Sequence, residues 1–137
     1  MDLKLTRLQH IGIPVTNLKK SILFYKSLGF CDVMTSQFPF GNEQGDVTMM
    51  KLGDMMIELY QYPPSERHAI GKRSHGHIDH IAFDVADIHH AYATLKGAGH
   101  HMLEEAPVFL PFWKNGCKYF NIAGPDGERL EFNQILS

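Results

Sequence analysis

An internal repeat is the feature of this chain that most restricts its fold. The segment HIGIPVTNL, which begins at His10, aligns with HIAFDVADI, which begins at His80, 70 positions later. The similarity continues in each copy to a glycine, Gly29 in the first and Gly99 in the second. A repeat of this size indicates two similar modules, so the two halves of the chain must be interpreted together.

Each copy begins with the pattern of a strand and continues with that of a helix. Apolar residues alternate with His10, Gly12 and Pro14, which is typical of a half-buried strand. Residues suited to helix N-caps follow, at Thr16-Asn17 and at Asp87. The next apolar residues recur at helical spacing, and each helix should end at the glycine of its copy. These residues are Leu18, Ile22, Tyr25 and Leu28, then Ile88, Tyr92, Leu95 and Ala98.

A second matched segment lies near the end of each copy. Residues 56–61 (MIELYQ) align with residues 129–134 (RLEFNQ), which places Glu58 over Glu131. Both glutamates alternate with apolar residues, so each points away from the core of its module. A histidine and a carboxylate are therefore predicted on the same face of each copy.

The remaining strands complete an α+β pattern of two tandem βαβββ modules, 5–61 and 77–135, joined by a linker at 62–76. Turn residues at 52–54 and 124–127 separate the last two strands of each module. With 137 residues, 44% of them hydrophobic, the chain is near the size of one compact domain, 1–137. We expect the strands near residues 31–38, 46–52 and 55–61, and near 101–105, 117–123 and 128–134.

Composition argues against several classes of partner. The net charge is −2, with 13 basic and 15 acidic residues interspersed, so no basic stripe is available for a nucleic acid. No segment has the apolar core of a signal peptide or the length of a membrane span. Cys31 and Cys117 lack the spacing of a zinc site or a disulfide framework. We expect a cytoplasmic protein with two free thiols, a small-molecule substrate, and no nucleic acid or membrane partner.

His10, Glu58, His80 and Glu131 are the candidate ligands of one divalent metal ion. Two imidazole nitrogens and two carboxylates suit Zn or Ni first, and also Co, Fe or Mn. In a fold with pseudo-twofold symmetry, two copies of one position converge on the axis. A single histidine or glutamate on a strand is more often only a solvated side chain, but here the pattern occurs twice in register.

Other histidines offer weaker candidates for a metal site. His75 and His77 form a competing local cluster with His80 in a glycine-rich stretch. His89-His90 and His100-His101 fall on the second helix and just after it, where imidazoles need no metal.

Four segments of the chain resemble the vicinal oxygen chelate superfamily, which includes glyoxalase I, methylmalonyl-CoA epimerase, extradiol dioxygenases and bleomycin-binding proteins. The segments are HIGIPVTNLKKSILFYKSLGF, MMKLGDMMIELYQ, HIDHIAFDVADIHHAYATLKGAG and GPDGERLEFNQ, and they cover nearly the whole chain. The resemblance implies a glyoxalase-like fold, in which the two modules form a cupped mixed sheet. The ligand order His, Glu, His, Glu matches glyoxalase I-like members. It implies that a metal-bound glutamate, Glu131 or Glu58, removes the proton next to a metal-chelated carbonyl.

Positions at which this sequence differs from known members of the superfamily allow the candidate activities to be ranked. Pro14 stands where bacterial glyoxalase I has an arginine that binds glutathione, so the thiol partner is open. The additional catalytic glutamate of the epimerase falls near Thr48, and Glu58 stands where the epimerase has a glutamine ligand. A glyoxalase-type lyase or isomerase of a small 2-oxo or hemithioacetal substrate therefore ranks above an epimerase-like isomerase. An oxygenase and a non-catalytic small-molecule (drug) binding protein rank below the lyase as well.

The sequence also predicts substrate contacts and an oligomeric state. Thr48 is one candidate substrate contact. Strand parity adds Tyr119 and Asn121, which it places on the metal face, with Phe120 and Ile122 in the core. The loop 110–116 carries Trp113, which either closes over the cleft as a lid or caps the core. Open edges of the sheets favour a homodimer.

Overall fold

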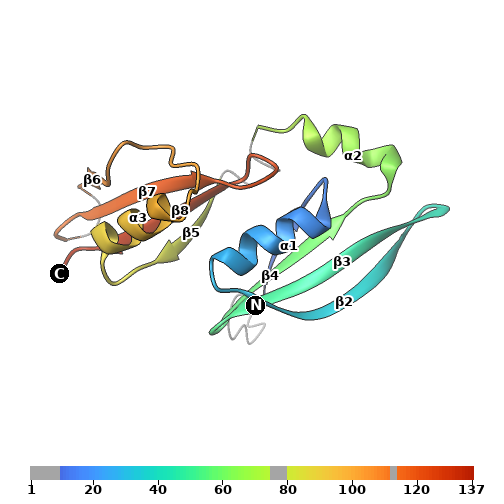
Figure 1. The fold of residues 1–137 in the computed structure, drawn as a ribbon, viewed down its shortest axis with the longest axis horizontal. Helices are drawn as coiled ribbons and strands as arrows, with labels where there is room; N and C mark the ends of the chain where they lie inside the picture. The colour runs from blue at the N-terminus through green and yellow to red at the C-terminus, as the bar shows by residue number, and fades with distance from the viewer. Residues whose placement is uncertain (1–9, 75–79, 112–113) are drawn as a thin grey trace, which may run out of the picture. The chain divides into compact units, whose positions relative to one another are not determined.

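In the computed structural model, the chain folds as two compact units, residues 1–72 (unit 1) and 73–137 (unit 2), and the described residues are 10–74, 80–111 and 114–137. The division falls inside the predicted linker. Each unit contains a helix and a four-stranded mixed sheet (Figure 1). The predicted α+β class is confirmed.

Unit 1 follows the predicted order of strand, helix and three strands. In its sheet, of order β1-β4-β3-β2, β1 runs parallel to β4 and the other neighbours are antiparallel. The elements are β1 (Ile11–Pro14), α1 (Leu18–Ser27), β2 (Cys31–Phe40), β3 (Glu43–Leu52), β4 (Met55–Gln61) and an additional helix, α2 (Pro64–Gly71).

Unit 2 repeats this topology. Its sheet has the order β5-β8-β7-β6, with β5 parallel to β8. The elements are β5 (Ile81–Asp84), α3 (Ile88–Gly97), β6 (Val108–Leu110), β7 (Cys117–Ala123) and β8 (Arg129–Ile135).

The predicted helix boundaries are confirmed at both ends. The side chain of Asn17 accepts a hydrogen bond from the backbone of α1, and that of Asp87 accepts two from the backbone of α3. After each helix, Gly29 and Gly99 have φ values of 98° and 85°, which side chains other than glycine rarely tolerate. Local chemistry in the sequence therefore determines where both helices begin and end.

A glutamine of the last strand fastens each helix to its sheet. The Gln61 side-chain oxygen accepts from the backbone N–H of Leu18 at 2.8 Å. The Gln134 oxygen accepts from Ile88 in the same way, at 3.0 Å. The first turn of each helix thus gains a partner for an otherwise unpaired N–H.

One face of each sheet packs against its helix and forms the core of the unit. Helix α1 contacts β2, β3 and β4, and α3 contacts β7 and β8. The opposite face of each sheet therefore carries the side chains of alternate parity, which include Glu58 and Glu131. The buried core residues include Ile13, Tyr25, Met50, Ile57 and Leu59 in unit 1, and Ile81, Ile88, Phe120, Ile122 and Leu130 in unit 2.

Two segments of unit 1 have more regular structure than predicted. The hairpin of β2 and β3 extends to a turn at Gly41, beyond the predicted limits of 38 and 46. The linker contains α2, whose Pro64 occupies the first helical position, where its missing N–H is not needed.

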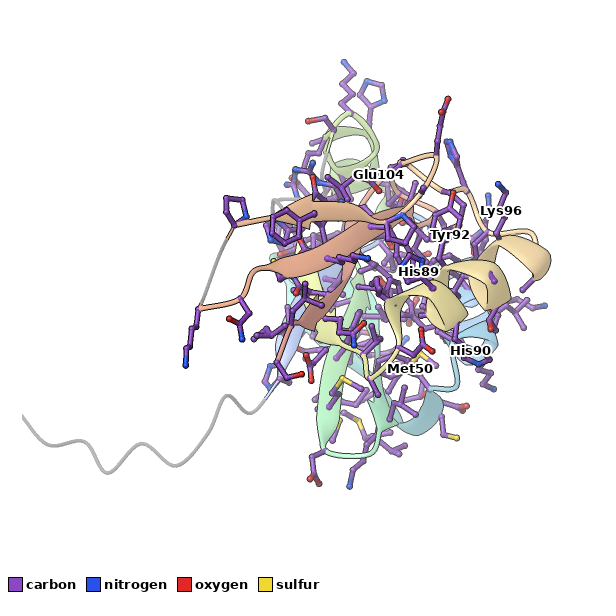
Figure 2. All side chains as sticks on the ribbon, turned by 90° about the vertical axis from the view of Figure 1, so that its left-hand side faces the viewer. Met50, His89, His90, Tyr92, Lys96 and Glu104 are labelled. Atoms are coloured by element: carbon purple, nitrogen blue, oxygen red, sulfur yellow. The ribbon has the colours of Figure 1, made fainter. Side chains whose placement is uncertain are left out.

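The strand predicted at residues 101–105 is wrong. Within this segment only Met102 forms an isolated bridge, with Ile122, and the third strand of the sheet is the short β6. The hydroxyl of Tyr92 binds the segment instead, donating to the backbone oxygens of Glu104 at 2.9 Å and Glu105 at 2.6 Å (Figure 2). Because these two backbone oxygens accept from Tyr92 of α3, the segment is held as a loop. Strand pairing begins only after Pro107, at β6.

Among the residues that the structure describes, no helix is long and apolar enough to cross a membrane.

Candidate metal centre

The first predicted ligand pair lies together in unit 1. His10 immediately precedes β1, and Glu58 lies on the neighbouring parallel strand β4, opposite Gly12. His10 Nε2 is 3.3 Å from Glu58 Oε2, and both side chains are about one third exposed, at 32% and 33%. The pair is therefore held by the backbone of two adjacent strands and remains open to solvent.

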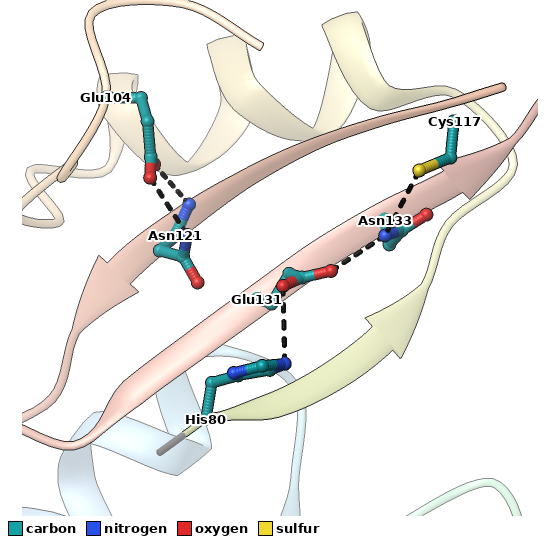
Figure 3. A network of polar contacts seen from close by, with 6 residues as sticks. All are labelled: His80, Glu104, Cys117, Asn121, Glu131 and Asn133. Carbon is teal, nitrogen blue, oxygen red and sulfur yellow. Dashed lines mark hydrogen bonds and ion pairs between the residues drawn. The ribbon is translucent and has the colours of Figure 1, made fainter. Parts of the chain in front are cut away.

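The second predicted pair has the same arrangement in unit 2. His80 precedes β5, and Glu131 lies on β8, opposite Ala82. His80 Nε2 is 3.5 Å from Glu131 Oε2 (Figure 3). The Glu131 side chain is more enclosed than its counterpart, with 15% exposure. The repeat seen in the sequence is thus also a repeat of one side-chain contact.

The separation of the paired atoms suits two ligands of one metal ion. Two atoms that each lie about 2.1 Å from a tetrahedral ion are about 3.4 Å apart. The two observed N···O distances, 3.3 Å and 3.5 Å, fall on either side of this value. Each pair also combines a neutral nitrogen with an anionic oxygen, the mixture that borderline divalent ions accept.

Each unit by itself provides two of the four predicted ligands. Within the described residues, no group of three or more His, Cys, Asp or Glu side chains gathers as a metal site. The competing cluster of His75 and His77 lies outside the described residues. His89 lies on α3, where its Nε2 is 3.2 Å from the Lys118 ammonium, a neighbour that disfavours a bound cation.

A polar network restrains Glu131. The amide nitrogen of Asn133 donates to Glu131 Oε1 at 2.7 Å and lies 3.8 Å from the sulfur of the buried Cys117 (Figure 3). Asn133 is two residues after Glu131, so both point to the same face of β8. Sequence parity could have identified Asn133, but only the register shows that it meets Cys117.

Asn121 occupies the same face, as predicted. It lies directly opposite Glu131, whereas its neighbours Phe120 and Ile122 are fully buried in the core, so the predicted facing of this strand is confirmed. Asn121 is only 4% exposed. Its amide nitrogen donates to Glu104 Oε1 at 2.9 Å, and its backbone N–H donates to Glu104 Oε2 (Figure 3).

This arrangement leaves the side-chain oxygen of Asn121 buried without a hydrogen-bond partner among the described residues. A buried acceptor of this kind is costly unless a ligand or water satisfies it. Tyr119 lies on the same face, opposite Asn133. No pattern in the sequence pointed to Glu104, because this residue lies in the segment wrongly predicted as a strand.

Unit 1 has a pocket beside Glu58. Its volume is about 320 Å³, and apart from Glu58 it is lined by Gly12, Phe38, Val47, Tyr60 and Tyr62. The candidate ligand therefore borders a mostly apolar cavity of the size that small-molecule sites have.

Comparison with known proteins places this arrangement in a family. Residues 7–132 match the model of the Glyoxalase/Bleomycin resistance protein/Dioxygenase superfamily. The chain belongs to this superfamily. A solved structure of a glyoxalase family protein from Enterococcus faecalis shares the fold, with a TM-score of 0.71 at 23% identity, over 96% of this chain and 99% of that chain.

Curated relatives within the superfamily have different names. The uncharacterized protein YwbC of Bacillus subtilis is 34% identical over 93% of this chain and 97% of its own length. A methylmalonyl-CoA epimerase of Dictyostelium discoideum is 31% identical over 74% of this chain and 62% of its own length. A lactoylglutathione lyase of Neisseria meningitidis is 29% identical over 96% of this chain and 92% of its own length.

Thr48, predicted to contact the substrate because the epimerase glutamate of the superfamily falls near it, faces the wrong way. It lies opposite Leu59, on the helix-covered face of the sheet, and is fully buried. Its hydroxyl is 3.1 Å from that of Thr35. The prediction for Thr48 is therefore wrong in unit 1, because strand parity turns this position away from Glu58. Trp113 lies outside the described residues.

Proposed function

We propose that this protein is a metal-dependent lyase or isomerase of the glyoxalase I type, with His10, Glu58, His80 and Glu131 as the ligands of one divalent ion. The observation that carries the proposal is the recurrence of one His–Glu contact at equivalent positions of both units. The N···O distance of each pair suits two neighbouring ligands of one ion. Membership of the superfamily supports a shared metal-binding role for the two pairs.

The proposed ion is Zn or Ni, and Co, Fe or Mn would also suit these ligands. When bound, it would polarise two neighbouring oxygens of the substrate and stabilise the charge that develops after proton removal. The four side chains would balance its charge, since two carboxylates neutralise a divalent cation. All other steps fall to residues of this chain.

Proton transfer is assigned to Glu58 and Glu131. In the proposed reaction, a carboxylate takes the proton from the carbon that carries the hydroxyl and sulfur of a hemithioacetal. It then returns the proton to the neighbouring carbonyl carbon, while the hydroxyl proton passes to the oxygen on that carbon. The former carbonyl thus becomes a hydroxyl group, and the former hydroxyl carbon becomes a thioester carbonyl. Of the two proposed bases, Glu58 is the one that borders the pocket, and Glu131 is the one that an amide, that of Asn133, restrains.

Substrate orientation is assigned to Asn121 and Tyr119. The Asn121 side-chain oxygen is turned away from Glu104 and lacks a partner among the described residues (Figure 3), so it suits a hydroxyl donor of the substrate. Tyr119, on the same face, adds a phenol that can donate to a carbonyl oxygen.

Elemental analysis followed by turnover assays tests the proposal. We expect one divalent ion per chain and conversion of methylglyoxal hemithioacetals, measured with glutathione and with other small thiols because Pro14 replaces the glutathione-binding arginine. Metal-loaded protein that converts no hemithioacetal at all would overturn the lyase assignment.

An epimerase-like isomerase is the second candidate, because the Dictyostelium epimerase is a relative. In this case the proton returns to the same carbon from the opposite side, which needs a second base. The fully buried Thr48 does not supply that base. Racemisation of 2-methylmalonyl thioesters, with no activity on hemithioacetals, would favour the epimerase.

A non-catalytic small-molecule binding protein is the third candidate. Metal content separates it from both enzymes, since purified protein that contains no divalent ion and takes up none at micromolar concentration would favour binding alone.

A further inference from the structure

The pocket of unit 1 has an aromatic wall built from two strands of its sheet. Phe38 lies on β2, Tyr60 on β4, and Tyr62 directly follows β4. Their ring centroids are 6.1 Å (Phe38–Tyr60), 5.6 Å (Phe38–Tyr62) and 5.2 Å (Tyr60–Tyr62) apart, at interplanar angles of 82°, 83° and 81°. The three rings contact one another edge to face and form one aromatic surface, on which an aromatic ring of a ligand can pack.

Two glycines make room for this wall. Gly12 lies below Tyr60, where an added methyl group would be 3.2 Å from the Tyr60 ring and 3.8 Å from Glu58 Oε2. Gly45 lies opposite Phe38, and any side chain there would collide with the Phe38 ring. The two glycines therefore leave space for the Phe38 and Tyr60 rings next to the backbone, and Tyr60 lies beside the candidate metal ligand Glu58.

The charge of the pocket restricts the ligand further. Among the described residues that line it, Glu58 is the only charged one, and none is Lys, Arg or His. Among these lining residues, a phosphate or carboxylate tail would find no cationic partner, and His10 is already paired with Glu58. With Glu58 committed to an ion, the rest of the cavity is apolar apart from the two phenol groups.

We infer that this pocket binds an uncharged aryl group attached to the carbonyl end of the substrate, so that the protein prefers aromatic 2-oxo or 2-hydroxy-carbonyl compounds to their methyl analogues. The inference rests on the proposed function for the position of the reacting carbonyl at Glu58. It identifies Tyr60, Phe38 and Gly12 as specificity-determining residues.

Binding of a matched ligand pair tests the inference. 2-Hydroxyacetophenone and hydroxyacetone have the same vicinal oxygens and differ only in a phenyl or methyl group. Dissociation constants are measured by ligand-observed NMR with the full chain, both with Zn²⁺ added and with a chelator. Burial of the additional ring surface should make the phenyl compound bind about tenfold more tightly or better. Dissociation constants within threefold of each other in both conditions would overturn the inference.

Variants locate the preference in the pocket. Tyr60→Ala should reduce it to about twofold, and Gly12→Ala should reduce it by displacing the Tyr60 ring. Phe38→Leu, which keeps apolar volume but loses the ring, provides a second readout if Tyr60→Ala fails to fold. Phe109→Ala removes an exposed phenyl group in unit 2 and serves as the control, with the preference unchanged. An undiminished preference in folded Tyr60→Ala and Phe38→Leu would exclude this pocket.

This binding experiment, together with the elemental analysis and turnover assays above, separates the two proposals. If the chain binds no metal and converts no substrate, but prefers the phenyl ligand in the presence of chelator, the proposed function fails and the aryl pocket stands. If metal and turnover are present and both ligands bind equally, the aryl pocket fails and the proposed function stands.

Discussion

The carboxylate of Glu104 holds Asn121 at two points, since Oε1 accepts from the side-chain amide at 2.9 Å and Oε2 accepts from the backbone N–H. This contact joins a loop to the strand that faces Glu131. It fixes which way the amide is turned, and therefore which atom of Asn121 is presented to a ligand.

Replacement of Glu104 by Ala should release this orientation. We expect the free energy of unfolding to fall by about 1–2 kcal/mol, because two hydrogen bonds to a partly exposed carboxylate are lost. KM for the converted substrate should rise as Asn121 becomes free to rotate. Glu105→Ala is the matched control, because only the backbone oxygen of Glu105 takes part in the loop contact. Equal effects of the two substitutions would contradict the positioning role.

Substitution of the proposed ligands should abolish tight metal binding. His80→Ala and Glu131→Ala each remove one of four donors, so elemental analysis after dialysis should find far less than one ion per chain. His89→Ala on α3 should retain the ion, and so should His75→Ala and His77→Ala. Full metal affinity in the His80 variant would eliminate the ligand assignment.

Residues that are proposed to contact the substrate but not the metal should affect turnover and leave the metal in place. We expect Tyr119→Phe and Asn121→Ala to lower kcat/KM by about tenfold or more, the effect of one lost hydrogen bond in a dry site. Metal content measured on the same samples should equal that of the wild type. Wild-type kinetics in both variants would show that this face of β7 does not meet the substrate.

Acid should weaken unit 2 through its helix cap. The backbone N–H of His90 donates the hydrogen bond that contributes most to holding the pKa of the Asp87 carboxyl below its usual value, and the backbone N–H of His89 contributes less. A lowered pKa in the folded state stabilises the fold above the ordinary value of about 3.9, and this contribution disappears as the pH falls further. Asp87→Asn should keep the cap and reduce the loss of thermal stability as the pH falls below about 4, as followed by circular dichroism at low salt.

Unit 1 provides the reciprocal variant for this experiment. Asn17 caps α1 with an uncharged side chain, so Asn17→Asp should introduce acid sensitivity where the wild type has none from this position. If neither variant changes the dependence of stability on pH, the caps do not contribute to it.

We propose a homodimer, because β2 lies at an edge of its sheet and exposes Val33 and Met34. Light scattering after size-exclusion chromatography should give twice the mass of the chain at micromolar concentration. Val33→Glu should shift the equilibrium toward monomer if β2 lies in the interface. A wild-type monomer under these conditions would refute the proposal.

Prediction from the sequence succeeded where the controlling interaction is local or periodic. Side chains alternate along a strand, so the facing of Asn121 followed from that of Glu131. The caps at Asn17 and Asp87 act within three residues of themselves. These short-range rules were enough for helices α1 and α3 and for most of the strands, but not for α2.

Prediction failed where contacts cross the sequence without a period. Glu104 meets Asn121 across 17 positions, and Tyr92 binds the same loop from a helix. The wall of Phe38, Tyr60 and Tyr62 depends on the register between β2, β3 and β4, which no single segment encodes. Thr48 was misplaced because alignment to a family position ignored the parity of its own strand.

The glutamine that holds α1 also favours the correct register of β4. Glu58 and Gln61 are three residues apart on β4, and therefore point to opposite faces of the sheet, one toward the pocket and one toward α1. A slip of β4 by one residue would turn Glu58 into the core and, at the same time, remove the Gln61 bond from the start of α1. Misaligned pairing is thus penalised twice, because a chain with its carboxylate on the wrong face also lacks the hydrogen bond that holds the start of α1.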